Sequence, residues 1–296
     1  MENIAAISGG VLLGLMVGSF LNVVIYRLPV MLEREWLREA KSMLSGDDAP
    51  LSQQDQPEEN AETFNLLTPR SRCQSCGKQI AAWNNIPVIS WLILRGRCSG
   101  CKASISARYP IIELITGLLS GLVVWKFGSG LEVLAVLVFV WSLITLTMID
   151  IDHMFLPDKI TLPLLWLGLL MSLAANQAQA SPFPTLASAV LGAAAGYLIL
   201  WSVYWLFKLL TGKEGMGYGD FKLLAALGAW LGISNIPLVI LLSAVVGAVV
   251  GIVMIVALGR ERQIPIPFGP YLAGAGLIAL FWGDQIISAY LGMSGL

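Results

Sequence analysis

Four cysteines lie in one stretch of the sequence and form two Cys-x2-Cys pairs. Cys73 pairs with Cys76 and Cys98 with Cys101, and 21 residues separate the two pairs. Such pairs supply four thiolates for a tetrahedral zinc ion, although two disulfides or four free thiols are the alternatives. Four protein ligands close the coordination sphere, so the sequence predicts a structural zinc site at Cys73, Cys76, Cys98 and Cys101. Its role would be to fold a loop with little apolar core.

Two aspartates lie at the ends of apolar segments, where an ionisable side chain is a functional hypothesis. Asp150 follows the apolar run 131–149, and Asp220 ends the sequence Gly217-Tyr218-Gly219-Asp220 at the start of another run. Two carboxylates that share a low-dielectric site titrate as a unit and hold one proton between them. That arrangement suits hydrolysis of a peptide bond. Gly217 and Gly219 would let a substrate backbone approach closely.

Other interpretations of these acids stay open at this point. An acidic residue at the start of a helix is an ordinary cap, which suits Asp220 and especially Asp158. Asp152 competes with Asp150, because the two point roughly 200° apart on a helix and periodicity does not choose between them. The only histidine, His153, is expected to be interfacial or hydrogen-bonding rather than a metal ligand.

The elements that must position these residues are membrane helices. Of the 296 residues, 56% are apolar and 12% are charged, and the mean hydropathy is +0.75. A soluble domain has about a quarter of its residues charged, so a soluble enzyme, a disordered chain and a nucleic-acid binder are excluded. The fold class is an all-α polytopic membrane protein with about eight transmembrane helices. The expected spans are 4–26, 109–125, 131–149, 161–175, 187–207, 223–233, 236–258 and 270–291.

Basic residues indicate the orientation of these spans. Eleven of the 18 lie between Arg27 and Arg108. The positive-inside rule therefore makes this loop cytoplasmic and the N-terminus periplasmic, which leaves only Lys126 outside the cytoplasm. Within the loop we expect a short amphipathic helix at 31–44, a flexible linker at 45–63 and the cysteine segment at 68–108. Both aspartates then lie at cytoplasmic ends of their spans.

Several further segments occur in a familiar order. They are Gly18-Ser19-Phe20-Leu21-Asn22-Val23-Val24-Ile25-Tyr26-Arg27-Leu28-Pro29, Arg108-Tyr109-Pro110-Ile111-Ile112-Glu113, Ile149-Asp150-Ile151-Asp152-His153, Leu156-Pro157-Asp158, Gly215-Met216-Gly217-Tyr218-Gly219-Asp220-Phe221-Lys222 and Pro267-Phe268-Gly269-Pro270-Tyr271. With the cysteine pairs, they make the sequence strongly similar to the bacterial type IV prepilin peptidases, over nearly the whole chain. These are leader peptidases that are also N-methyltransferases. The segment 31–63 resembles an insertion common in Gram-negative members.

The resemblance implies specific site residues. The first catalytic aspartate of the family lies seven residues before the proline of Leu-Pro-Asp, which selects Asp150, and the second is Asp220 of Gly-x-Gly-Asp. It also implies three parts: a first transmembrane helix at 1–28, a cytoplasmic loop domain at 29–108 and a transmembrane aspartic peptidase domain at 109–296.

The resemblance also implies the reactions and the location. The substrates would be type IV prepilins or type II secretion pseudopilins. Their short basic leader is cut after a glycine at the cytoplasmic face of the bacterial inner membrane. The new N-terminal residue, usually phenylalanine, is then methylated with S-adenosylmethionine. The partners would be these substrates and membrane lipid, with no nucleic acid.

The methyl-transfer site is not assigned by the residues. No glycine-rich fingerprint for the methyl donor is present, and the candidates are the cytoplasmic loop, the first-span motif and Glu113. Glu113 would either carry the substrate amine or cap a helix.

Two other functions compete with the leading hypothesis. One is a Gly-x-Gly-Asp protease of the presenilin or signal-peptide-peptidase kind, which has no need of the cysteine loop. The other is a zinc-stabilised membrane scaffold or transporter, which would more naturally carry charges in the middle of its spans.

Overall fold

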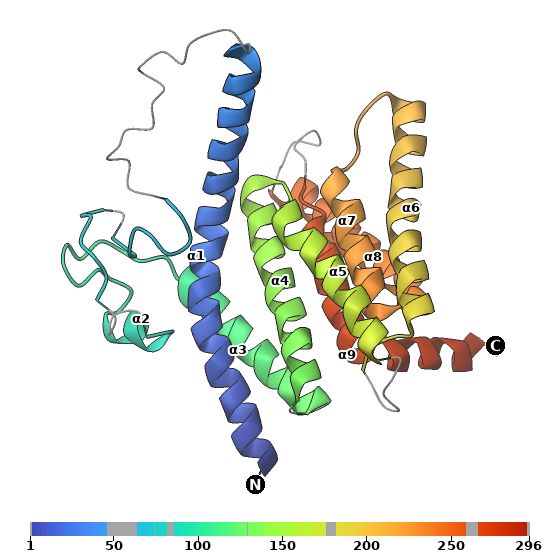
Figure 1. Cartoon of the computed structure of the whole chain (residues 1–296), viewed down its shortest axis with the longest axis horizontal. Helices are drawn as coiled ribbons and strands as arrows, with labels where there is room; N and C mark the ends of the chain where they lie inside the picture. The colour runs from blue at the N-terminus through green and yellow to red at the C-terminus, as the bar shows by residue number, and fades with distance from the viewer. Residues whose placement is uncertain are drawn as a thin grey trace. The chain divides into compact units, whose positions relative to one another are not determined.

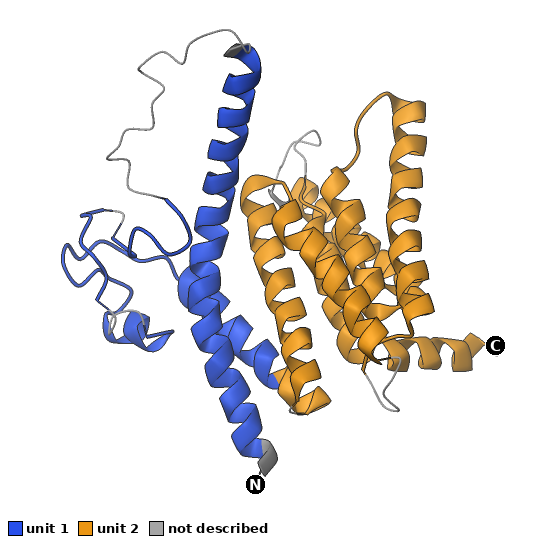
Figure 2. Ribbon diagram, in the orientation of Figure 1, with its two compact units in different colours: residues 1–121 blue, residues 122–296 orange. Residues whose placement is uncertain are grey.

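The computed structural model describes residues 2–45, 64–73, 75–81, 86–128, 130–175, 182–258 and 266–294. Most of these residues are helical (Figure 1). Their β-structure is limited to two isolated bridges, Arg72 with Gln79 and Arg97 with Ser104. The chain divides into two compact units, residues 1–121 and 122–296 (Figure 2). The linker predicted at 45–63 lies almost entirely outside the described residues.

The first helix of unit 1 is longer than the sequence predicted. Helix α1 runs from Glu2 to Ser45, so the expected first span and the expected amphipathic helix at 31–44 are one continuous helix. Pro29 lies inside it, where a proline removes one backbone hydrogen bond without necessarily ending the helix. Leu28 and Leu32 are buried on either side of it.

Small residues bring α1 close to helix α3, Arg108–Phe127. A Cβ atom on Gly14 would lie 2.7 Å from the carbonyl oxygen of Thr116, and one on Gly18 would lie 2.7 Å from Cα of Glu113. Within a membrane the hydrophobic effect does not drive helices together, so close packing of their backbones at small residues is important. In the described part of the segment between α1 and α3 lies the short helix α2, Ile89–Ile93.

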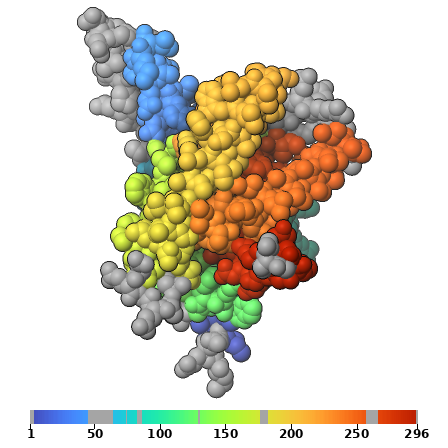
Figure 3. All heavy atoms as spheres, turned by 90° about the vertical axis from the view of Figure 1, so that its right-hand side faces the viewer, coloured from blue at the N-terminus to red at the C-terminus, as the bar shows by residue number. Residues whose placement is uncertain are grey.

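Unit 2 is a bundle of long helices around a short one. Its helices are α4 Leu131–His153, α5 Asp158–Ala175, α6 Leu186–Thr211, α7 Tyr218–Leu231, the 3-10 turn η2 Ile233–Asn235, α8 Ile236–Leu258 and α9 Gly269–Ser294. Eleven residues of α7 are buried, because α5, α6, α8 and α9 all contact it. Helices α6 and α8 lie at the surface of the unit (Figure 3).

Glycines on α6 and α7 fix the position of the short helix. A Cβ atom on Gly196 would lie 2.6 Å from the carbonyl oxygen of Leu224, and one on Gly228 would overlap the carbonyl group of Gly192. On the other side of α7, the indole of Trp230 fills the space beside Gly168 and donates to the carbonyl of Leu164 at 2.8 Å. Helix α7 is therefore held by backbone-to-backbone packing as well as by apolar side chains.

The helices meet the requirements of a multi-pass membrane protein. Within the described residues, seven helices are long and apolar enough to cross a membrane: α1, α3, α4, α5, α6, α8 and α9. The sixth expected span, 223–233, corresponds to α7, which begins at Tyr218 and has 14 residues. At 1.5 Å per residue it is about 21 Å long, less than the ~30 Å of a bilayer core. Protein surrounds it instead.

Candidate active site and metal centre

Asp150 lies in the last turn of α4, is only 5% exposed and faces the start of α9. The backbone N–H of Gly269 donates to its Oδ2 atom at 2.9 Å. Gly269 is the first residue of α9, where backbone N–H groups have no partner within the helix. The carboxylate of Asp150 is thus fixed by another helix, 119 residues away in the sequence.

Asp220 lies in the first turn of α7 and is 7% exposed. The backbone of Gly217, the N-cap residue of the helix, lies close to the carboxyl group of Asp220. Asp220 therefore lies at a helix start, as the sequence alternative assumed, but Gly217 and not Asp220 is the cap residue. This position does not compete with a chemical role, because the same carboxyl group interacts electrostatically with Asp150.

Leu156 packs beside Gly219, the neighbour of Asp220, and beside Gly269, which binds Asp150. A Cβ atom on Gly219 would lie 2.9 Å from Cβ of Leu156, and one on Gly269 would lie 3.2 Å from its Cδ2. Leu156 is buried and follows the turn that ends α4, where Met154 adopts a left-handed conformation with φ of 58°. The turn directs the chain between α7 and α9. The two buried carboxyl groups lie at the same end of unit 2, close enough to interact electrostatically.

The acids that competed with Asp150 in the sequence have other surroundings. Asp152 and His153 are exposed. Asp158 lies in the first turn of α5 and forms an ion pair with Lys222 of α7, with 2.7 Å between Oδ2 and Nζ. Since Lys222 is two residues from Asp220, this pair joins α5 to the helix end that carries Asp220.

The two glycines of Gly-x-Gly-Asp differ in their surroundings. Leu156 occupies the space beside Gly219, so this glycine serves packing within the protein rather than the substrate approach expected from the sequence. Around Gly217, the nearest atoms to an added Cβ are Asp220 Oδ2 at 3.9 Å and the nitrogen of Gly219 at 4.0 Å. Of the two glycines, Gly217 is thus the one with open space beside it.

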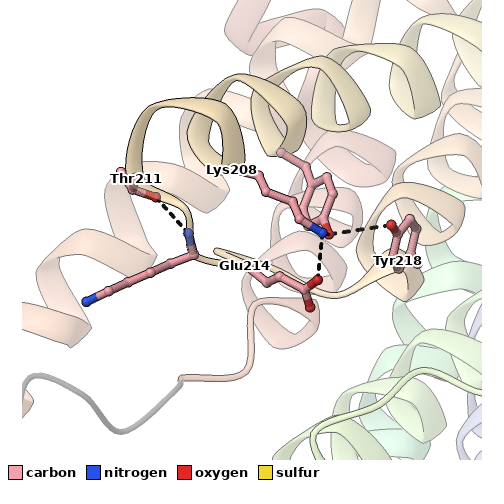
Figure 4. Close-up of polar contacts among 6 residues, drawn as sticks. Lys208, Thr211, Glu214 and Tyr218 are labelled. Carbon is pink, nitrogen blue, oxygen red and sulfur yellow. Dashed lines mark hydrogen bonds and ion pairs between the residues drawn. The ribbon is translucent and has the colours of Figure 1, made fainter.

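A polar network ties the segment before α7 to the end of α6 (Figure 4). Lys208 donates to Glu214 at 2.8 Å and to the hydroxyl of Tyr204 at 3.2 Å. The hydroxyl groups of Tyr204 and Tyr218 lie 3.4 Å apart. The hydrogen bond from Lys208 holds the pKa of Glu214 below its usual value. These contacts fix both sides of Gly217 and hence the position of Asp220.

The four cysteines form one cluster in unit 1. Their Sγ atoms all lie within 4.8 Å of one another, and those of Cys73 and Cys101 are 3.8 Å apart. Thiolates at ~2.3 Å around a tetrahedral zinc ion are separated by about 3.8 Å, whereas disulfide sulfurs are ~2.05 Å apart. The donor set and its spacing therefore fit a metal ion, and all four are free thiols.

The turns favour the thiolate form of one cysteine in each pair. The backbone N–H groups of Gly100 and Cys101 lower the pKa of the Cys98 thiol to about 6, and those of Cys76 and Ser75 lower the pKa of Cys73. The hydrogen bond with Cys76 and burial raise the pKa of Cys101 to about 11. Metal binding requires deprotonated cysteines, and Cys73 and Cys98 meet this requirement most readily. The positive φ that such a turn needs is 68° at Gly77 and 60° at Lys102. Gly100 instead leaves room for the side chain of Lys78.

Comparisons with known proteins agree on one family. A model of the bacterial peptidase A24 N-terminal domain matches residues 12–127, and one of the type IV leader peptidase family matches residues 137–252. The chain is 57% identical to a protein of Stutzerimonas stutzeri over 94% of this chain and 91% of the relative. The chain belongs to the type IV leader peptidase family.

Further relatives in this family have the same name. A protein of Pseudomonas aeruginosa is 53% identical over 96% of this chain and 93% of its own length. One of Neisseria gonorrhoeae is 51% identical over 93% of this chain and 90% of its own. All three relatives are named prepilin leader peptidase/N-methyltransferase. No solved structure matches the chain.

Residues 18–29 form the motif of the first span, which the sequence left as a candidate for methyl transfer. Two of its polar side chains form hydrogen bonds with later parts of unit 1, including the segment that leads into the cysteines. Arg27 is buried and donates to the carbonyl groups of Asn65, at 2.8 Å, and Pro69. Asn22 donates to the carbonyl of Tyr109 at 3.2 Å. The side chains of Asn22 and Arg27 thus have hydrogen-bond partners within unit 1.

Glu113 is neither a helix cap nor an exposed acid. It is 8% exposed, accepts from the backbone N–H of Val88 at 2.7 Å and is hydrogen-bonded to Ser19. Val88 has a φ of 60°, a conformation that a β-branched residue rarely adopts. The carboxylate thus fixes a strained backbone position between α1 and α3.

Sequence reasoning missed the residues that support the aspartates. Gly269 and Leu156 have side chains without reactive groups, and the family match ends at 252, before Gly269. The available signal was the segment Pro267-Phe268-Gly269-Pro270, in which a glycine precedes a proline near a helix start.

Proposed function

We propose that this chain removes the leader from type IV prepilins or pseudopilins with Asp150 and Asp220, and then methylates the new N-terminus. The observation that carries the proposal is that these two buried carboxyl groups, from α4 and α7, lie at the same end of unit 2 and interact electrostatically. The names of the family members support both activities.

The two carboxyl groups can divide the work of hydrolysis. The ionised group accepts a proton from water while the water oxygen attacks the carbonyl carbon of the leader glycine. The protonated group supports the carbonyl oxygen and then gives its proton to the departing amine as the C–N bond breaks. The pair ends with one proton, as it began. The open space at Gly217 is where the substrate backbone approaches Asp220.

Methyl transfer is the second reaction of the proposal. The free amine of the mature pilin attacks the methyl carbon of S-adenosylmethionine, the sulfur–carbon bond breaks, and the amine loses a proton. Zinc held by Cys73, Cys76, Cys98 and Cys101 has a structural role here, because all its ligands come from the protein. It would keep the segment 64–107 folded.

We place the N-terminus in the periplasm and the aspartates at the cytoplasmic face of the inner membrane. The support is the gathering of charge at the end of unit 2 that holds the carboxyl groups: Asp158, Lys208, Glu214 and Lys222 contact one another in pairs there. The positive-inside rule makes that end cytoplasmic. A reporter inserted at residue 63 should be cytoplasmic, and one inserted at residue 178 periplasmic.

The decisive experiment is to incubate the purified protein in detergent with a prepilin and labelled S-adenosylmethionine. Mass spectrometry of the pilin N-terminus then reports cleavage and methyl transfer together. We expect Asp150→Asn and Asp220→Asn each to reduce cleavage by at least about a thousandfold, since each removes one partner of the proton exchange. Asp152→Asn is the matched control and should cleave as the unaltered protein does.

Methylation separates the two halves of the proposal. Both active-site variants should still methylate a pilin supplied without its leader. Cleavage that survives in either variant would remove the aspartate pair, and unmethylated products from the unaltered protein would remove the second activity.

A further inference from the structure

We propose that Gly269 is a positioning residue for the aspartate pair, an inference that rests on the proposed peptidase function. Its backbone N–H lies 2.9 Å from Oδ2 of Asp150, in a buried setting. Because this N–H belongs to the first residue of α9, no carbonyl group of the same helix competes for it. The donor and the helix dipole behind it both favour the ionised form of Asp150.

Glycine is required at this position for space rather than for backbone conformation. Gly269 is not among the glycines with positive φ. A Cβ atom added to it would lie 2.6 Å from Oδ2 of Asp150, 3.2 Å from Cγ of Asp150 and 3.2 Å from Cδ2 of Leu156. A contact of 2.6 Å is closer than real Cβ atoms approach, so any side chain at 269 would displace the carboxylate or the start of α9.

The hydrogen bond and the absence of a side chain at residue 269 both concern Oδ2 of Asp150. The N–H fixes Oδ2 and the missing side chain permits its approach, so the direction of the second oxygen, Oδ1, is set by α9. The groups that face the Asp150 carboxyl among the described residues are Asp220 from α7 and this N-terminus of α9. Asp152 and Asp158, which follow Asp150 in the sequence, are exposed. Gly269 therefore determines where Asp150 lies relative to Asp220.

The test compares Gly269→Ala with Gly274→Ala in prepilin cleavage. Both changes add one methyl group to α9, but a Cβ atom at 274 meets no atom within 4 Å. We expect Gly269→Ala to lower kcat for cleavage at least about tenfold, the scale of a misplaced catalytic group. Gly274→Ala should stay within about twofold of the unaltered protein. Cleavage by the unaltered protein is measured first, because its absence would refute the proposed function and not this inference.

A pH profile distinguishes positioning from simple loss of folded protein. The added methyl group displaces the Asp150 carboxylate from the backbone N–H of residue 269, which removes a hydrogen bond to the ionised form. The acid limb of the cleavage profile of Gly269→Ala should therefore move to higher pH. A smaller folded fraction would lower the profile without moving it. Full activity of Gly269→Ala, or an unshifted profile at reduced activity, overturns the inference.

A stability measurement keeps the test valid if Gly269→Ala folds poorly. The added methyl group should lower the melting temperature less in an Asp150→Ala background than in the unaltered protein, because the carboxylate it would overlap is gone. An equal decrease in both backgrounds shows that the glycine does not serve Asp150, and this also overturns the inference.

Discussion

Asp150 and Asp152 are two positions apart in the sequence, and their surroundings differ completely. On one helix turn they point roughly 200° apart, so only one can face α9 and α7. Asp150 does so and is 5% exposed, whereas Asp152 is exposed. Both residues are aspartates, so the residue type does not distinguish them. Burial and the hydrogen bond from Gly269 distinguish Asp150 as the aspartate for which we propose a chemical role.

The role of Glu113 also depends on its individual contacts. Its carboxylate accepts a hydrogen bond from the backbone N–H of Val88. We predict that Glu113→Gln retains near-normal stability, because an amide oxygen can still accept from Val88. Glu113→Ala leaves that buried N–H unpaired and should cost about 1–3 kcal/mol. Thermal unfolding of both variants is the measurement. If Gln fails in methylation while the fold is intact, the carboxylate has a chemical role instead.

The ion pair of Lys208 and Glu214 gives a pH-dependent prediction. The folded state holds the pKa of Glu214 below its usual value, so the contribution of the pair is complete above about pH 4.3. It is lost as the pH falls through the lowered pKa. The melting-temperature difference between the unaltered protein and Glu214→Gln should be constant from pH 7 to 5 and shrink as the pH falls below the usual range of a glutamate pKa, about 4.3. It should also be small, because Glu214 is 66% exposed. A difference that grows on acidification contradicts this assignment.

At the scale of elements, the short helix α7 is the part of unit 2 on which the Gly-x-Gly-Asp segment depends. Its length does not match a bilayer, and four other elements enclose it. Gly192, Gly196 and Gly228 allow its backbone to touch that of α6. Such packing leaves α7 little freedom, which keeps Asp220 at a fixed depth.

We therefore predict that Gly228→Ala disturbs the site although it lies two turns from Asp220. The methyl group would overlap the carbonyl of Gly192 and should destabilise the protein by about 1–3 kcal/mol, with a loss of cleavage. Gly292→Ala in α9 is the control, since its Cβ meets no atom within 4 Å. Melting temperature and cleavage rate are compared. Equal behaviour of the two variants would show that α6 and α7 do not need this contact.

At the scale of the whole molecule, the chain places its two kinds of site in different units. The cysteine cluster and Glu113 belong to residues 1–121, and both aspartates with Gly269 belong to residues 122–296. Each site is completed inside its own unit, from residues far apart in the sequence. Damage to one site is therefore expected to leave the local structure of the other in place.

Metal removal tests this separation. We predict that the purified protein contains one zinc ion per chain. Chelation should expose the segment 64–107 to proteolysis, because the cysteines hold turns that have little apolar core. Fragments from residues 122–296 should stay protected, and added zinc should restore protection of unit 1. Protein that lacks zinc, or a segment that stays protected after chelation, would contradict the structural role.

The sequence by itself determined the all-α membrane fold, most helix bounds and the clustering of the cysteines. These features depend on local composition, periodicity and spacing, and α8 begins and ends as expected at 236 and 258. The choice of Asp150 over Asp152 came from the family resemblance and stays a prediction. The tertiary structure decided that α1 continues through Pro29, that α7 is enclosed by protein, and that Gly269 and Leu156 surround the aspartates. No periodicity shows a contact between residues 119 positions apart, because its energy comes from packing between helices and not from either segment alone.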